Sequence, residues 1–352
     1  MSFKLIINAD DFGPIDFINQ GIFYHASRGN LDSAQVLTNM EDKDLLRERL
    51  KRLHSFIPKD RTFDLGVHFT LTSGAPITKS ADWGKMLKGN SFKPFDKFHF
   101  GYADYLQIIK AEFAAQRDRL LELVDDVNTD MKSELLTVNS VSNHHNLFTI
   151  APDLFEAYVG AAEEGRKALK IRSPKASPYE TMNRYYELVL PLRNFSDNKE
   201  QRQLMATMND EFAKNNYYGN KSITIETPHY IDVSFYADLG SLAVGELKTK
   251  KIDKRLEKFD GIVNRASKYI TNDKIEPQLP IVEVVFHLGT STPVSTGEKY
   301  KDLIEGYEGV TSKYFDNREI EVAALTKLSQ GKHKDLIQTK VSWDECGKVT
   351  YR

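Results

Sequence analysis

Cysteine is nearly absent from this sequence, which has 352 residues and a single cysteine, Cys346. One thiol cannot form an intramolecular disulfide or supply a cysteine-rich zinc site. Any metal ion would therefore have to be bound by histidine and carboxylate side chains.

An excess of charge and long apolar runs are missing as well. The 48 basic residues nearly balance the 50 acidic ones, so the electrostatic footprint of a nucleic-acid-binding protein is absent. No apolar stretch approaches the length that spans a bilayer, and the amino terminus has no signal-peptide pattern. We expect a cytoplasmic protein that binds neither nucleic acid nor membrane.

Strand-like and helix-like segments alternate over most of the chain. The expected strands are Leu5–Asn8, Ser33–Leu37, Phe63–Leu71, Leu135–Val141, Lys170–Arg172, Ser222–Glu226, Ile281–Phe286 and Val341–Trp343. The expected helices are Phe17–Ala26, Lys43–Leu53, Tyr102–Val127, Pro152–Leu169, Asn198–Asn216, Leu242–Ile270 and Asn317–Leu328. This alternation predicts parallel strands joined by crossover helices, with an active site at the carboxyl ends of the strands.

Two adjacent carboxylates, Asp10 and Asp11, follow the apolar run Leu5-Ile6-Ile7. Burying both without a counter-charge is costly. A cation that neutralises one carboxylate and leaves the other as a base would explain the pair. The alternative is that one of them caps the helix that starts near Pro14, with Gly13 forming the turn.

Four histidines also fall where strands are expected to end: His68, His144, His145 and His287. In a parallel architecture these positions converge with the two aspartates on one mouth. One carboxylate and two imidazoles form a common catalytic set for a divalent ion, and the remaining aspartate and histidine suit a base and an acid.

The remaining histidines and the loop aromatics carry weaker signals. His25, His54 and His333 are expected at the surface, whereas His229 either lines the mouth or packs in a loop. The aromatic residues of the loops, Trp83, Phe92, Phe95, Tyr179 and Tyr230, could stack on a bound ligand, the alternative being ordinary loop packing.

Taken together, these segments resemble the YdjC-like carbohydrate deacetylases, a family that includes chito-oligosaccharide deacetylases. The matching segments are Asn8-Ala9-Asp10-Asp11-Phe12-Gly13, Gly66-Val67-His68-Phe69-Thr70-Leu71-Thr72, His144-His145-Asn146, Ile171-Arg172-Ser173-Pro174 and Glu283-Val284-Val285-Phe286-His287-Leu288-Gly289. The resemblance implies one α/β domain over 1–352, an irregular (β/α) barrel of the TIM-barrel type. The rhythm loosens at about 178–275, where we expect a largely helical insertion; its segment 242–269 is interpreted as a solvated helix.

The resemblance also implies residue roles. Asp11, His68 and His144 would bind one divalent metal ion, with Zn²⁺ or Mg²⁺ favoured. Asp10 would act as the base, His287 as the acid, and Arg172 would orient the substrate or Asp10. His145 and His229 are further candidates for substrate binding. For a carbohydrate substrate, the loop aromatics named above could stack on the faces of the sugar rings.

Two departures from the family pattern stand out. The third family motif commonly reads Asp-Ser-His-X-His-X-His, but here it is Ser142-Asn143-His144-His145-Asn146, which leaves open whether His144 or His145 is the ligand. In addition, Leu288 replaces the proline of the usual His-Pro-Gly.

The expected activity is metal-dependent removal of an N-acetyl group from an amino sugar or oligosaccharide. The partner would be a small carbohydrate substrate, and we also expect a homodimer. Two alternatives stay open: another metal-dependent hydrolase of phosphoesters or amides on the same barrel, and a non-catalytic sugar-binding relative.

Overall fold

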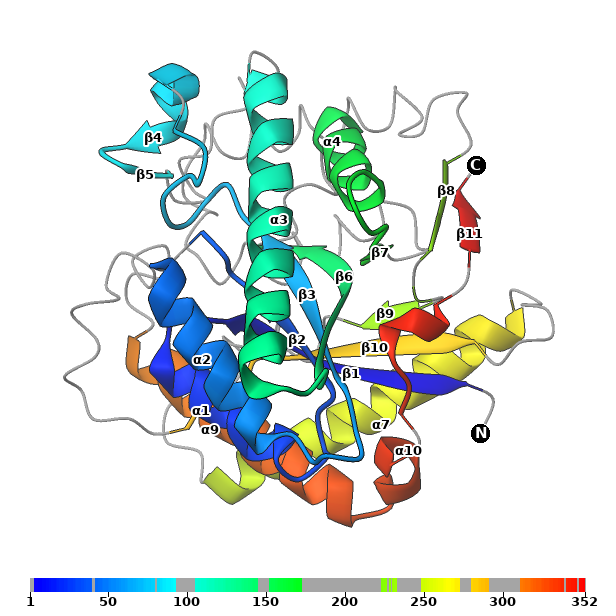
Figure 1. Ribbon diagram of the computed structural model, residues 1–352. Helices are drawn as coiled ribbons and strands as arrows, with labels where there is room; N and C mark the ends of the chain where they lie inside the picture. Colours follow the sequence, from blue (N-terminus) through cyan, green and yellow to red (C-terminus); the bar gives the residue numbers. More distant parts are fainter. Residues whose placement is uncertain are drawn as a thin grey trace.

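The structure is a computed structural model of the whole chain (Figure 1). It describes residues 3–39, 42–79, 81–92, 105–144, 152–172, 223–226, 228, 230–232, 248–272, 280–290, 311–338, 340–346 and 348–351. The expected helix Asn198–Asn216 lies outside these ranges.

A seven-stranded parallel sheet forms the centre of the molecule, in the order β7-β6-β3-β2-β1-β10-β9. Its strands are β1 (Lys4–Phe12), β2 (Ser33–Val36), β3 (Phe63–Phe69), β6 (Leu136–Asn143), β7 (Lys170–Ile171), β9 (Tyr230–Asp232) and β10 (Ile281–Phe286). Short antiparallel pairs join β4 (Leu87–Lys88) to β5 (Ser91–Phe92), and β8 (Ile223–Glu226) to β11 (Lys348–Tyr351).

Helices follow the strands around the sheet (Figure 1). They are α1 (Asp16–Ala26), α2 (Lys43–Phe56), α3 (Leu106–Met131), α4 (Pro152–Glu163), α7 (Lys248–Asn272), α9 (Thr311–Gln330) and α10 (Lys334–Gln338). In space, neighbouring helices run α4, α3, α2, α1, α9, α7, which matches the order of the strands they flank. None of the described helices combines the length and apolar character needed to cross a bilayer.

The sheet is strongly curled. Arg172 directly follows β7, and its guanidinium lies 2.8 Å from a carboxylate oxygen of Asp10 on β1. In a flat sheet these strands would be four spacings, or about 19 Å, apart, farther than an arginine can reach. The curl brings both to one interior and confirms the predicted α/β, barrel-like fold as a half-barrel. Among the described strands no pairing joins β7 to β9, and closure into a complete barrel stays a prediction.

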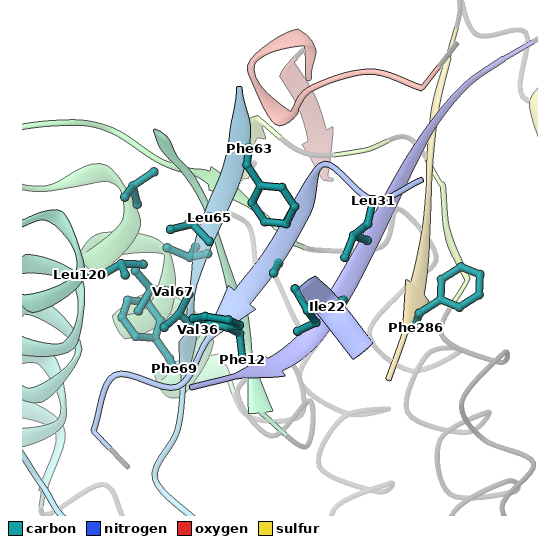
Figure 2. Close-up of a cluster of buried hydrophobic side chains, with 14 of the residues drawn as sticks. Phe12, Ile22, Leu31, Val36, Phe63, Leu65, Val67, Phe69, Leu120 and Phe286 are labelled. Carbon is teal, nitrogen blue, oxygen red and sulfur yellow. The ribbon is translucent and has the colours of Figure 1, made fainter. Parts of the chain in front are cut away.

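Strand alternation separates an apolar outer face from a polar inner face. On β3, Phe63, Leu65, Val67 and Phe69 point outward into the core beneath the helices, where they meet residues such as Leu120 of α3 (Figure 2). The intervening side chains of β3 point inward, as do Asn8, Gln35 and Glu283 on other strands; all of these are buried. The interior is therefore a hydrogen-bonded polar network.

The helix α7 differs from the solvated helix expected in this region. Its Phe259, Ile262 and Ala266 are buried in the main core, and the helix packs against α9. Only part of its surface is charged and exposed, so the interpretation of a solvated insertion is wrong for its inner face. Whether 178–275 is an insertion remains a prediction.

The prediction of a last strand at Val341–Trp343 is wrong. Trp343–Glu345 form a single 3₁₀ turn (η8) whose start is capped by the Ser342 hydroxyl, and the strand comes later as β11. Tertiary contacts decide this geometry: Trp343 is fully buried and its backbone N–H donates to Asp64 of β3 at 2.9 Å.

Three histidines expected at the surface are buried instead. His25 lies between α1 and α9, where its Nε2 contacts the Val322 carbonyl at 3.0 Å. His54 contacts the Ser133 carbonyl at 2.9 Å, and His333 contacts Asp260 at 2.6 Å. In each ring Nε2 has a hydrogen-bond partner from a distant part of the chain, which lowers the cost of burying the imidazole.

Candidate metal centre and active site

Asp10 and Asp11 lie together because β1 is irregular at its carboxyl end. The register between β1 and β2 shifts between Ala9 and Phe12, and Asp11 has a left-handed φ of 68°. A bulge of this kind interrupts strand alternation, so both carboxylates face His68, whose Nε2 is 3.9 Å from Asp10 Oδ2 and 3.4 Å from Asp11 Oδ1. Neither caps α1, which begins after Ile15 without a side-chain cap.

Asp11, His68 and His144 present three donor atoms to one point. Asp11 Oδ1 is 3.4 Å from His68 Nε2 and 3.2 Å from His144 Nδ1, and the two nitrogens are 3.3 Å apart. Ligand atoms about 2.1 Å from a metal ion lie about 3.0 Å apart in octahedral and about 3.4 Å apart in tetrahedral geometry. The observed triangle fits one divalent ion bound by these three residues.

The electrostatics of the triangle agree with this assignment. Burial alone would raise the pKa of Asp11, but the His144 and His68 imidazoles outweigh it and lower the pKa well below its ordinary value. Burial also lowers the pKa of His68. Asp11 is therefore an anion and His68 a neutral imidazole, the forms in which both bind metal.

Hydrogen bonds behind His68 orient its ring. His68 Nδ1 lies 2.6 Å from the Ser142 hydroxyl, which donates its own proton to Gln35 Oε1 at 2.8 Å. The hydroxyl must therefore accept from Nδ1–H, which leaves the Nε2 lone pair for the metal side. A Cβ at Gly66 would overlap the Gln35 amide and the Ser140 hydroxyl, which explains the glycine in this segment.

Asp10 stands beside the triangle and is held by Arg172. Nη1 and Nη2 of Arg172 donate to its two oxygens at 2.8 and 2.9 Å, and Asn8 Nδ2 donates at 2.9 Å. Burial lowers the pKa of Arg172, but Asp10 and Glu283 raise it above the ordinary value. The arginine is thus a permanent cation fixed between two carboxylates.

His287 closes another side of the site. It follows β10, and its Nε2 is 3.8 Å from Asp11 Oδ2. Its backbone N–H donates to the buried Glu321 of α9 at 2.6 Å. Gly289 and Gly21 of α1 approach so closely that a Cβ on Gly21 would meet the Gly289 backbone at 2.7 Å. Packing against two helices therefore sets where the imidazole lies.

The structure brings together six of the eight predicted site residues: Asp10, Asp11, His68, His144, Arg172 and His287. His145 and His229 lie outside the described residues. Of the aromatic candidates, Trp83 and Phe92 are buried edge to face against each other, with ring centroids 5.0 Å apart. That arrangement is loop packing rather than a sugar platform.

Sequence reasoning missed Gln35 and Glu321 and assigned no role to Ser142 or Glu283. Glu283 had a usable signal, because a carboxylate in the middle of the apolar strand Ile281–Phe286 raises the same burial problem as Asp10 and Asp11. Gln35, Ser142 and Glu321 had none, since serine, glutamine and glutamate occur throughout the chain.

The YdjC-like protein family model matches residues 4–330, and the chain belongs to this family. Curated relatives named carbohydrate deacetylase include one from Clostridium beijerinckii, 25% identical over 194 residues, which are 55% of this chain and 70% of the relative. Another, from Listeria monocytogenes, is 26% identical over 145 residues, or 41% of this chain; the match spans only about half of that relative (52%). One from Halalkalibacterium halodurans is 40% identical over 77 residues, 21% of this chain and 29% of the relative.

A solved structure shares the fold. It is an Enterococcus faecalis V583 protein named for a proposed role in cellobiose-phosphate cleavage, with a TM-score of 0.53 and 18% identity over 98% of both chains. At this identity the likeness concerns the fold alone.

Proposed function

We propose that this protein is a metal-dependent carbohydrate deacetylase that removes an N-acetyl group from an amino sugar or oligosaccharide. The observation that carries the proposal is the triangle of Asp11, His68 and His144 with Asp10 and His287 on its flanks. The names of the curated relatives support the choice of substrate.

Asp11, His68 and His144 would hold the ion, with Zn²⁺ and Mg²⁺ favoured. When bound, a divalent ion polarises the acetyl carbonyl and makes water a nucleophile near neutral pH. The protein supplies a fixed negative charge from Asp11 and a neutral imidazole from His68, and the side chains of all three ligands are buried.

Asp10 is proposed as the base. Arg172 and Asn8 hold its carboxylate in one orientation, so it can take the proton of the attacking water as the new C–O bond forms. His287 is proposed as the acid that gives a proton to the amide nitrogen while the C–N bond breaks. The products are acetate and the free amino sugar, and the protons balance between the two residues.

The hydrogen bonds that Arg172 already makes favour an amide substrate over a phosphoester substrate. A phosphoryl group is usually bound by cations that face it, whereas the guanidinium of Arg172 is engaged by Asp10 and Glu283. The sugar and its length, a homodimer and a cytoplasmic location remain predictions.

The proposal is tested by measuring acetate release from N-acetylated mono- and oligosaccharides, after stripping the protein of metal and reloading it. We expect release that depends on the metal and is lost in Asp10→Asn, with one ion still bound per chain. One bound ion without acetate release from any such sugar would favour another hydrolase or an inactive binder.

A further inference from the structure

Arg172 is shared by two carboxylates that approach different edges of its guanidinium. The Nη1 and Nη2 end faces Asp10. The Nε and Nη2 edge faces Glu283, with Nε 2.9 and 3.1 Å from its two oxygens and Nη2 2.6 Å from Oε1. Four of the five N–H groups are used in this way.

The two carboxylates differ in how they can act. Asp10 lies at the irregular end of β1, beside the metal triangle. Glu283 lies in the middle of β10, is completely buried, and within the described part of the chain receives its hydrogen bonds from Arg172. Arg172 in turn donates to Asp10, so the influence of Glu283 on Asp10 passes through the arginine.

We propose that Glu283 is a positioning residue that fixes Arg172 so that Arg172 in turn fixes Asp10; this role rests on the proposed function. Arg172 extends from the end of a two-residue strand at the sheet edge, and a long side chain from such a position has many rotamers. The Glu283 carboxylate, in the middle of β10, selects the rotamer of Arg172 in which Nη1 and Nη2 reach Asp10. Arg172 is therefore a holder of the base rather than a ligand of the substrate.

Two variants test the role. Glu283→Gln keeps the shape and one acceptor, and Glu283→Ala removes both acceptors. We expect kcat to fall by about 10-fold in the first and up to about 100-fold in the second, the range that follows from misplacing a catalytic group by about 1 Å. KM and metal affinity should stay within about twofold of wild type, because the ion's ligands are untouched.

Asp64→Asn is the matched control. Asp64 is a buried inward-facing carboxylate on β3 whose partners are Thr137, Asn139, Ser342 and Trp343. Its loss should reduce the melting temperature without changing kcat. A loss of kcat in Asp64→Asn equal to that in Glu283→Gln would reduce Glu283 to a structural residue and overturn the proposal.

Crystal structures of the two Glu283 variants separate this proposal from the proposed function. We expect the Nη1 and Nη2 bonds to Asp10 to be lost or rearranged while the triangle stays in place. If both bonds persist in both variants, the positioning role is wrong, whatever the rates. If the bonds change but wild-type protein releases no acetate, the positioning of Asp10 stands and the deacetylase assignment fails.

Discussion

The His68 ring and the Ser142 hydroxyl form a 2.6 Å hydrogen bond that determines which imidazole nitrogen faces the metal site. Ser142 stands where the resembled motif commonly has aspartate. In this chain the partner of His68 Nδ1 is therefore an uncharged hydroxyl, backed by the neutral Gln35 amide.

We predict that Ser142→Ala weakens metal binding by about 10- to 100-fold, the usual effect of losing an outer partner of a histidine ligand. The binding constant is measured by calorimetry on metal-free protein. Ser55→Ala, at an exposed site on α2, is the control. Equal affinity in Ser142→Ala and wild type would show that Ser142 does not set the His68 tautomer.

Gly66→Ala should disrupt the same network by overpacking. Its methyl group would overlap the Gln35 amide and the Ser140 hydroxyl, so we expect a loss of stability of about 1–3 kcal/mol together with weaker metal binding. Gly160→Ala in α4 meets only Glu164 at 3.8 Å and should be neutral or stabilising by up to about 1 kcal/mol. Urea unfolding compares the two variants.

His25 predicts a pH dependence of stability that is independent of the site. Burial lowers the pKa of His25 from 6.5 to about 4, although its bond to the Val322 carbonyl opposes the shift. Between these values the unfolded chain binds the proton that the folded chain excludes, so stability is complete above pH 6.5 and falls as the pH drops toward 4.

The slope attributable to this one histidine should approach about 1.4 kcal/mol per pH unit inside that window. His25→Gln should flatten the profile between about pH 4.5 and 6.5, which urea unfolding at stepwise pH measures. An unchanged slope in His25→Gln would mean that other groups cause the acid sensitivity.

Trp343 predicts a structural role for the carboxyl-terminal segment, which lies beyond the matched residues 4–330. The ring is fully buried with Ile6, Ile281 and Cys346, and Nε1 donates to the Ser33 hydroxyl at 3.0 Å. Trp343→Ala should cost about 3–5 kcal/mol of unfolding free energy, whereas Trp343→Phe, which keeps most of the apolar contact, should cost less. Chemical denaturation distinguishes the two, and equal stability of Trp343→Ala and wild type would contradict burial of this ring.

Several elements could be predicted from residue patterns because their signals are local. The apolar runs at residues 5–8, 63–71, 135–141 and 281–286 form strands of the sheet, and the polar residues near or after their carboxyl ends meet at one end. Parallel strands place their carboxyl ends together, so Asp11, His68 and His144 could be anticipated as neighbours before any coordinates.

Other features depend on contacts between residues far apart in the chain. Burial of His25 requires α9, and the 3₁₀ turn at Trp343 requires Asp64 and Ser33. The local sequence predicts an exposed His25 and a strand at Val341–Trp343, and only packing against distant elements decides otherwise.

The sequence by itself therefore determined the kinds of side chain at the strand ends and the parallel α/β architecture that gathers them, because hydrophobic periodicity is encoded residue by residue. Only the tertiary structure decided how these side chains are held. The bulge turns Asp10 and Asp11 to one side. The curl of the sheet lets Arg172 bind both Asp10, which is 162 positions away in the sequence, and Glu283, which is 111 positions away. Such long-range pairings leave no periodic trace, since each is fixed by the packing of the whole sheet.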